Sequence, residues 1–164
     1  MCKNKKVRLV METPIGRMAV EAENKAITAV YFTDEELLSS DEKLLQEAQK
    51  QLQQYFAGER STFELPLRLQ GTPFQLSAWH ALQQIPYGET RTYGQQAVMM
   101  GKPKAVRAVG GANHHNPIAI VIPCHRVVAA DGIGGYAMGV DKKHFLLSLE
   151  KQTQIRMKAD VEDD

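Results

Sequence analysis

The chain has 164 residues, 43% of them apolar, and a formal net charge of +1 at pH 7. This length fits one ordinary domain or two small ones, and the absence of any run near the roughly 18 apolar residues of a membrane span excludes a membrane protein. The basic start at Met1–Lys6 is not followed by an apolar stretch, so no secretory signal is expected. With only Cys2, on a terminus expected to be frayed, and Cys124, we expect no disulfide, no metal site and a cytoplasmic location.

The near-neutral total hides a charge asymmetry. Residues Met1–Ser77 carry 10 basic and 11 acidic side chains, whereas Trp79–Lys158 carries 10 basic and 4 acidic ones. The last residues, 159–164, form a short acidic tail. A basic region of this kind favours a surface that binds a polyanion such as nucleic acid.

Residues 1–70 predict a small N-terminal α/β domain. Three strands of an antiparallel meander are expected at Val7–Met11, Met18–Val20 and Ile27–Phe32. Apolar residues then recur at helical spacing from Leu44 to Phe56, with Ser40 or Asp41 as the N-cap and Gly58 after the last turn.

Residues 71–158 predict a mostly helical C-terminal domain. Thr72-Pro73 is a strong helix start, and Pro86-Tyr87-Gly88 breaks that helix. A further helix is expected from about Thr92 to Met99, and another from Lys102-Pro103 to a stop at Gly110-Gly111. The last two have the length of a helix-turn-helix, although a plain corner of two helices fits the same pattern. Asp141 is expected to cap a final helix.

The run Ile118–Ile122 is apolar throughout and rich in β-branched residues, so it predicts a short buried strand. Pro123 ends this strand, and Cys124 follows beside His125 and Arg126. Neighbouring cations lower the pKa of a thiol and favour the thiolate. A buried structural cysteine is the alternative interpretation.

Two further features concern this cysteine. A distant carboxylate such as Glu150 could complete a relay of nucleophile, base and orienting group with Cys124 and His125. Because neighbours on a strand point to opposite faces, such a relay requires a turn or a bridging water. Three glycines in 132–135 predict either a tight turn or a loop whose backbone approaches a ligand closely.

The string Pro123-Cys124-His125-Arg126-Val127 resembles the active-site signature of the O6-alkylguanine–DNA alkyltransferases. The resemblance extends over about half of the chain, from Thr72 to Glu150. The other matching strings are Thr72–Gln75, Ile85–Thr90, Thr92–Tyr93, Ala105–Gly110, Asn116–Pro117, Gly135–Tyr136 and Leu146–Leu147. It implies an α+β protein with a ribonuclease-H-like N-terminal domain and a winged-helix-like C-terminal domain that contains a helix-turn-helix.

The resemblance also implies roles for individual residues. Cys124 would accept the alkyl group, activated through a water by His125, which Glu150 orients. Asn116 would fix the turn before the active site, Tyr93 would press on the target's phosphate and bond the flipped base, and Arg107 would fill the gap in the duplex. Further DNA contacts are implied for Thr92, Gly94, Lys102, Ala105, Gly110 and Ala130. The guanine pocket would be lined by Val127, Gly135, Tyr136 and Ala137.

The implied activity is the single-turnover repair of O6-alkylguanine, with O4-methylthymine as a second substrate, in double-stranded DNA. The resemblance implies a monomer without cofactor or metal, since the zinc site of some members needs cysteines that the N-terminal half lacks. Cys124 argues against the non-catalytic relatives, while Asn113-His114-His115 departs from the family pattern. A thiol hydrolase and a helix-turn-helix regulator without chemistry are the competing hypotheses.

Overall fold

The computed structural model describes residues 6–162, so Cys2 and its predicted terminus lie outside the described residues. The chain divides into two compact units. The first comprises the residues up to Gln70 together with Pro117–Val121, and the second comprises Gly71–Asn116 together with the residues from Ile122 onwards. The segment that leads to Cys124 therefore packs with the first unit, although Cys124 itself belongs to the second.

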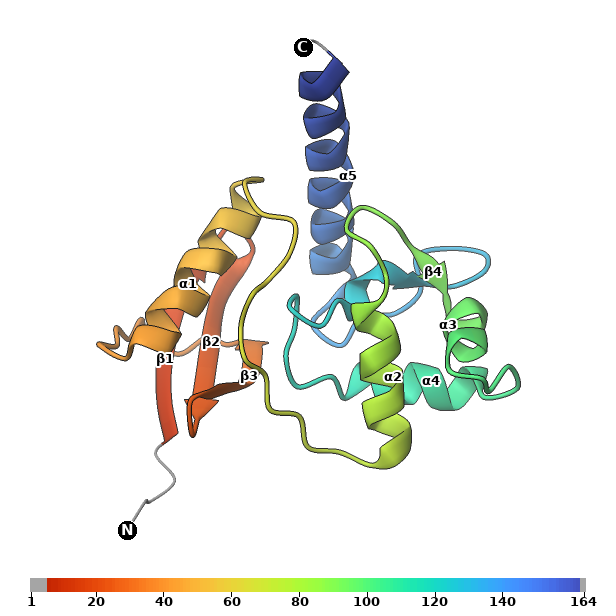
Figure 1. The fold of residues 1–164 in the computed structure, drawn as a ribbon, viewed down its shortest axis with the longest axis horizontal. Coiled ribbons are helices and arrows are strands. Elements are labelled where there is room, and N and C mark those ends of the chain that lie inside the picture. Colours follow the sequence, from red (N-terminus) through yellow and green to blue (C-terminus); the bar gives the residue numbers. More distant parts are fainter. Residues whose placement is uncertain (1–5, 163–164) are drawn as a thin grey trace. The chain divides into compact units, whose positions relative to one another are not determined.

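The first unit is an antiparallel sheet covered on one face by a helix (Figure 1). Its strands, in the order β1-β2-β3, are β1 (Lys6–Thr13), β2 (Gly16–Glu23) and β3 (Ala26–Phe32). Helix α1 (Lys43–Phe56) buries its apolar stripe, including Leu45 and Leu52, which confirms the predicted meander and helix. The predicted N-cap of α1 is wrong, because Glu42 is the N-cap and Ser40 instead accepts a bond from the Glu42 N–H. The prediction for Gly58 is confirmed, since it follows the C-cap Ala57 with a φ of 73°.

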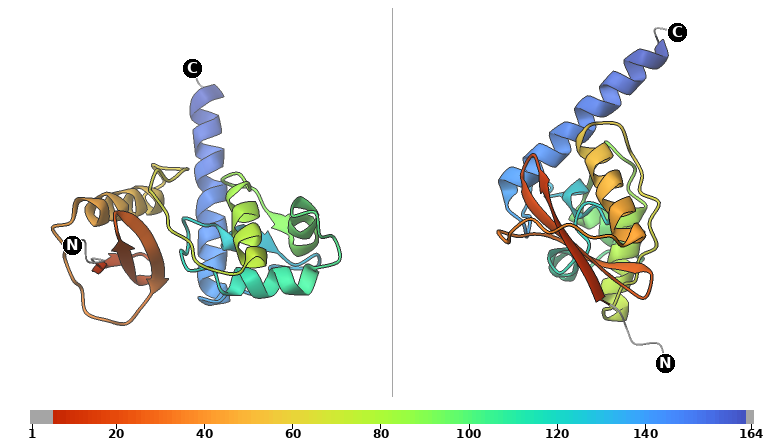
Figure 2. Two further views of the ribbon diagram at one scale, coloured as in Figure 1. Left: turned by 60° about the horizontal axis from the view of Figure 1, so that its bottom comes forward. Right: turned by 90° about the vertical axis from the view of Figure 1, so that its left-hand side faces the viewer.

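The second unit is mostly helical (Figures 1 and 2). Its helices are α2 (Pro73–Gln83), α3 (Tyr93–Met99), α4 (Val106–His114) and α5 (Val140–Glu162), with the 3-10 turn η1 (Cys124–Arg126). Two short parallel strands, β4 (Arg91–Thr92) and β5 (Val127–Val128), join the turn before α3 to the segment after η1. The predicted α+β class, with a helical C-terminal domain, is confirmed.

Side-chain caps explain where α2 and α3 begin. Thr72 accepts a bond from the Gln75 N–H, and the Gln75 side chain accepts one from the Thr72 N–H. Thr92 and Gln95 form the same reciprocal pair at the start of α3. Each pair satisfies N–H groups that a helix start otherwise leaves unpaired, so both starts agree with the sequence pattern.

The fourth helix differs from its predicted bounds. It begins at Val106 rather than at Lys102-Pro103, and it passes through Gly110-Gly111 to end at His114. Each glycine costs about 1 kcal/mol of helix propensity. Buried contacts beyond the glycines offset that cost. Trp79 Nε1 donates to the Ala112 carbonyl at 2.9 Å, and the Asn113 side chain forms a hydrogen bond with Gln96 of α3.

The predicted strand at Ile118–Ile122 is wrong. Ile118 forms a single bridge to Val30 at the edge of β3, and the chain then turns, with Ile120 at a φ of 71°. A β-branched residue rarely adopts this conformation, and a residue with a positive φ ends a strand. The prediction of burial is correct for Ile118 and Ile120, which are both at most 1% exposed.

The final helix is longer than expected. Helix α5 begins at Val140, so Asp141 lies inside its first turn rather than at the cap. It continues to Glu162 and therefore includes the start of the predicted acidic tail, whose last two residues lie outside the described part of the chain. Figure 2 shows its C-terminal turns extending beyond the other elements of the second unit.

A buried amide pair holds α4 against α3. Gln96 Nε2 donates to Asn113 Oδ1 at 2.9 Å, and Asn113 Nδ2 donates to Gln96 Oε1 at 2.7 Å. Gln96 is fully buried and also donates to the Ala78 carbonyl of α2 at 3.1 Å.

We predict that Gln96→Ala lowers the free energy of unfolding by roughly 1–3 kcal/mol, because it leaves the Asn113 amide buried without its partner. The double variant Gln96→Leu, Asn113→Leu removes both amides. Its loss of unfolding free energy should be smaller than the sum of the losses in the single variants Gln96→Leu and Asn113→Leu. Urea unfolding followed by circular dichroism measures all of these changes. Additive losses would show that the two amides do not act as a pair.

Candidate active site

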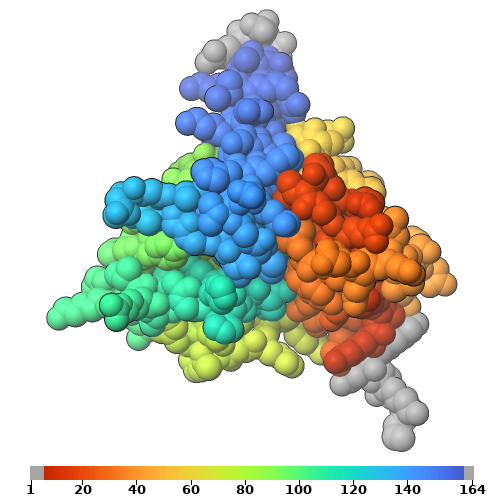
Figure 3. Space-filling model, turned by 180° about the vertical axis from the view of Figure 1, so that it is seen from behind, coloured from red at the N-terminus to blue at the C-terminus, as the bar shows by residue number. Residues whose placement is uncertain are grey.

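A cavity of about 350 Å³ opens in the second unit. Its wall combines the recognition helix candidate α4, the segment at η1 and the loop between β5 and α5. The lining residues are Tyr93, Gly110, Asn113, His114, Cys124, Gly135, Tyr136, Ala137 and Val140. Figure 3 shows the loop after β5 and the α3–α4 turn projecting on the same side of this unit.

Cys124 is the first residue of η1, directly after Pro123. The Asn116 side chain donates to the Ile122 carbonyl at 2.7 Å and also bonds the Cys124 thiol. Asn116 thus fixes the backbone immediately before the cysteine and contacts its sulfur.

Burial raises the pKa of the Cys124 thiol, and the Asn116 bond and the charge of Lys143 oppose this rise without cancelling it. The expectation of a lowered thiol pKa is therefore wrong. His125 and Arg126, which were expected to supply the lowering charge, bond Glu150 instead. A thiol of this kind stays protonated at neutral pH, so a reaction through its thiolate needs a base.

Glu150 of α5 accepts hydrogen bonds from three residues, two in η1 and one in the turn after α2. His125 Nε2 donates to Oε2 at 2.5 Å, and Arg126 Nε donates to Oε1 at 2.8 Å. The Gly88 N–H, in the turn after α2, also donates to Oε1 at 3.1 Å. Burial raises the pKa of Glu150, but the His125 bond and the Arg126 charge outweigh it and lower the pKa to about 2.

His125 is completely buried, and burial lowers its pKa despite the opposing effect of Glu150. The ring is therefore neutral at pH 7, with its proton on Nε2 facing the carboxylate. The other ring nitrogen, Nδ1, is buried and has no hydrogen-bond partner among the described residues. Nδ1 therefore carries a free lone pair, on the residue that directly follows Cys124 in the sequence.

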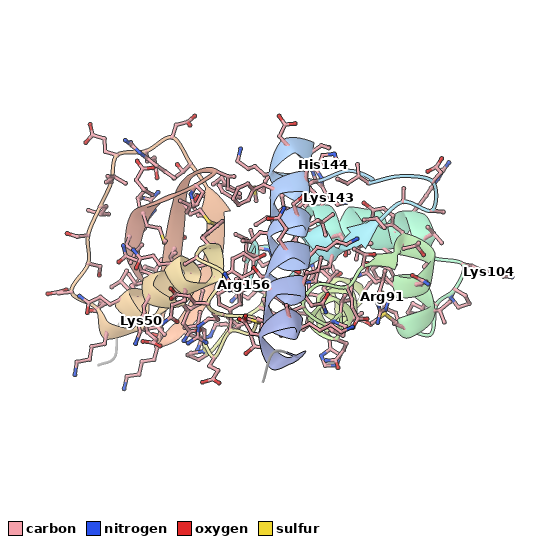
Figure 4. All side chains as sticks on the ribbon, turned by 90° about the horizontal axis from the view of Figure 1, so that it is seen from above. Lys50, Arg91, Lys104, Lys143, His144 and Arg156 are labelled. Atoms are coloured by element: carbon pink, nitrogen blue, oxygen red, sulfur yellow. The ribbon has the colours of Figure 1, made fainter. Side chains whose placement is uncertain are left out.

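Lys143 is a buried residue of this site that the sequence analysis missed. Its Nζ donates to the Val127 carbonyl at 2.6 Å and to the Gly135 carbonyl at 2.8 Å. Burial lowers its pKa to about 8, partly opposed by the nearby Cys124. Figure 4 labels Lys143 next to His144 near the start of α5. A lysine in the first turn of a helix usually faces solvent, so only its two carbonyl acceptors could have revealed it.

The loop between β5 and α5 forms one side of the cavity. Tyr93 OH donates to the Gly135 carbonyl at 3.4 Å. Gly134 has a φ of 75°, and a Cβ there would lie 3.1 Å from the Tyr93 hydroxyl, so this position requires glycine. Tyr136 and Ala137 line the cavity as expected. Val127 is buried and is not one of the lining residues, and its carbonyl accepts a bond from Lys143.

The residues expected to bind DNA lie around α3 and α4. Thr92 caps α3, Gly94 follows in its first turn, and Lys102 and Ala105 lie in the α3–α4 turn. Arg107 is exposed on α4, and Ala130 is exposed in the turn after β5. Gly110 faces the cavity, where an added Cβ would lie 4.0 Å from the Tyr93 ring. Figure 4 shows Lys104 pointing away from the body of this unit.

Residues 6–162 lack two features. No group of three or more His, Cys, Asp and Glu side chains in this range could hold a metal ion. No helix in the same range is both long and apolar enough to cross a lipid bilayer.

Comparison with known proteins places these features in a family. Residues 73–152 match the profile of the "6-O-methylguanine DNA methyltransferase, DNA binding domain", and residues 7–69 match that of the "ribonuclease-like domain" of the same proteins. The chain belongs to the 6-O-methylguanine DNA methyltransferase family.

Individual relatives are similar over nearly their whole length. A methylated-DNA–protein-cysteine methyltransferase of Methanosarcina acetivorans is 47% identical over 149 residues, which are 86% of this chain and 96% of the relative. The constitutive enzyme of Bacillus subtilis is 45% identical, covering 85% of this chain and 92% of the relative. Among solved structures, the Mycobacterium tuberculosis O6-methylguanine methyltransferase has a TM-score of 0.83, with 41% identity over 91% of this chain and 94% of its own.

A second structure of the Mycobacterium tuberculosis protein was determined in complex with DNA. It has a TM-score of 0.82 and 42% identity, and the match covers 89% of this chain and 93% of that chain. Together with the DNA-binding-domain profile over residues 73–152, this likeness supports DNA as the partner of the chain.

We predict that Lys143→Met slows the alkylation of Cys124 by iodoacetamide roughly three- to tenfold at pH 7. The charge of Lys143 lowers the thiol pKa, so its loss raises that pKa and reduces the thiolate fraction. Above pH 8 the wild-type lysine loses its charge, and the two rates should converge.

A pH–rate profile measured by peptide mass spectrometry checks this expectation. Lys151→Met, which removes an exposed lysine of the same helix, is the matched control and should leave the profile unchanged. A constant rate ratio at all pH values would assign Lys143 to loop structure alone.

Proposed function

We propose that the protein repairs O6-alkylguanine in double-stranded DNA by transferring the alkyl group irreversibly to Cys124. The observation that carries the proposal is the position of the Cys124 thiol in the wall of a cavity whose other wall is α4. The helix that contacts DNA and the nucleophile therefore share one pocket. A base in a stacked duplex is out of reach of a thiol, so it must rotate out to enter this pocket.

Residues 71–158 supply both DNA binding and chemistry. Helix α4 enters the minor groove, where the small residues Ala105 and Gly110 allow close approach. Thr92, Gly94, Lys102 and Ala130 contact the backbone of the DNA. Arg107, exposed on α4, fills the space that the rotated base leaves in the stack. Tyr93 presses on the phosphate of the target nucleotide and bonds the rotated base.

The proton of Cys124 leaves through a water to Nδ1 of His125, which is neutral and unpaired. Glu150 orients the ring and stabilises the resulting imidazolium. The thiolate attacks the alkyl carbon, the bond from that carbon to O6 breaks, and its electron pair leaves with guanine. The Tyr93 hydroxyl stabilises the charge that develops on the base.

The product is a thioether on Cys124, which water does not cleave. Each molecule therefore reacts once. The cavity also admits a pyrimidine, which is smaller than guanine, so O4-methylthymine is proposed as a second substrate. We further propose a monomer in the reducing cytoplasm, because one chain supplies the thiol, the cavity and α4, and the thiol must stay reduced.

We predict that incubation with DNA containing O6-methylguanine places one methyl group per molecule on Cys124. Peptide mass spectrometry measures the site and the stoichiometry. Cys124→Ser should abolish transfer and keep DNA binding. Methyl on another residue would overturn the proposal, and product beyond one equivalent would favour the thiol hydrolase.

We also predict that Arg107→Ala slows repair of duplex DNA roughly ten- to a hundredfold, because it leaves the rotated base uncompensated. Repair of the free base O6-methylguanine needs no rotation and should change little. The ratio of the two rates is the measured quantity.

Lys104→Ala is the matched control for that ratio, since it removes one positive charge from the neighbouring turn. It should weaken DNA binding and reduce its salt dependence, but leave the rate at saturating DNA unchanged. Equal losses by Arg107→Ala on duplex and free base would mean that Arg107 supports the pocket rather than base rotation.

A further inference from the structure

The hydroxyl of Tyr136 is buried and has no hydrogen-bond partner among the described residues. Nδ1 of His125 is likewise buried and without a hydrogen-bond partner among these residues. Buried polar groups in folded proteins are nearly always hydrogen-bonded, and an unpaired one is costly. Tyr136 lines the cavity beside Cys124, and His125 directly follows Cys124 in the chain, so a single polar partner from solvent or substrate can serve both atoms.

Tyr136 lies in the loop after β5 and lines the same cavity as Cys124. Burial raises the pKa of its phenol well above the usual value, and negative charge on Cys124 or Glu150 raises it further. Tyr136 is thus close enough to both groups to sense their charge. Its phenol keeps its proton at every working pH and is available only as a neutral donor or acceptor.

We propose that the Tyr136 hydroxyl donates a hydrogen bond to the water that carries the proton from Cys124 to His125, and so positions that water. This inference rests on the proposed function, which supplies the proton transfer. It gives Tyr136 a role in the chemistry that is separate from the contact of its ring with a bound base.

This water would form three hydrogen bonds. It accepts from the Tyr136 O–H and from the Cys124 S–H, and it donates to Nδ1 of His125. On transfer the S–H bond breaks, the water passes its own proton to Nδ1, and it keeps the proton from sulfur. The result is a thiolate and an imidazolium paired with Glu150, while Tyr136 keeps its proton throughout.

The Tyr136 hydroxyl occupies one lone pair of the water and so directs the other lone pair toward the thiol. Phenylalanine keeps the ring in the pocket wall but removes this donor. The variant Tyr136→Phe therefore separates the role of the hydroxyl from the role of the ring.

The test is the rate of Cys124 alkylation by iodoacetamide between about pH 5 and 10, for wild type and Tyr136→Phe. We expect a rate at pH 7 that is roughly three- to tenfold lower, the effect of losing one hydrogen bond. The rates should converge at high pH, where the thiol ionises without the relay. The control is Tyr87→Phe, which removes a hydroxyl near Glu150 but outside the cavity lining and should change the rate less than about twofold.

A double-mutant cycle with His125→Ala adds a second criterion. Once the base is removed, Tyr136→Phe should have no further effect, because both act through one water. The inference is overturned by an unchanged pH profile of Tyr136→Phe, by an equal loss at every pH, or by additive losses in the cycle. The pH profile alone decides if His125→Ala does not fold.

The iodoacetamide reaction needs no DNA, so it separates this inference from the proposed function. A shifted profile in a protein that takes no methyl group from DNA would refute the function and keep the role of Tyr136. Methyl transfer to Cys124 with an unshifted pH profile of Tyr136→Phe would support the function and refute the role of Tyr136.

Discussion

The second unit depends on one buried carboxylate. Glu150 is 1% exposed and accepts hydrogen bonds from His125, Arg126 and the Gly88 N–H. Removing one partner of such a buried ion pair typically costs about 3–5 kcal/mol, because a charge is left uncompensated. The ionised and paired carboxylate therefore ties helix α5 to the turn η1 and to the turn after α2.

The two residues that bond this carboxylate, Arg126 and His125, have different roles. Arg126 supplies the positive charge that balances Glu150, and it also donates to the Ile85 carbonyl at 2.8 Å. His125 can then remain neutral and still donate through Nε2. Without Arg126, a buried glutamate would favour the protonated imidazole, and Nδ1 would lose its lone pair. The arginine of the signature thus keeps the neighbouring histidine neutral, so that Nδ1 can accept a proton.

Local chemistry in the sequence predicted much of the fold. Thr72-Pro73 and Thr92 mark helix starts because their side chains bond N–H groups within one turn, and such bonds depend on a few neighbouring residues. The strands of the first unit follow the same logic, with Asn24 and Lys25 at positive φ in the turn between β2 and β3. Gly110-Gly111 was misinterpreted because the contacts that hold the helix there come from Trp79 and Gln96, which lie far away in the sequence.

The sequence named several residues that the structure brings together, but it did not predict their electrostatics. Cys124, His125 and Glu150 were named, yet the direction of the thiol pKa was wrong because burial is a property of the fold and outweighs the charge of adjacent residues. Lys143 was missed since its partners are backbone carbonyls, which every residue carries. Ile118–Ile122 has the composition of a strand, but the positive φ of Ile120 is set by its surroundings.

The raised pKa of Cys124 has a consequence for the lifetime of the protein. Thiolates, rather than thiols, are the species that peroxides oxidise and that stray electrophiles modify. Under the proposed single-turnover mechanism, every such modification costs the molecule its one repair event. The raised thiol pKa keeps the thiolate fraction of the resting protein small, so fewer molecules lose their acceptor sulfur before they meet a substrate.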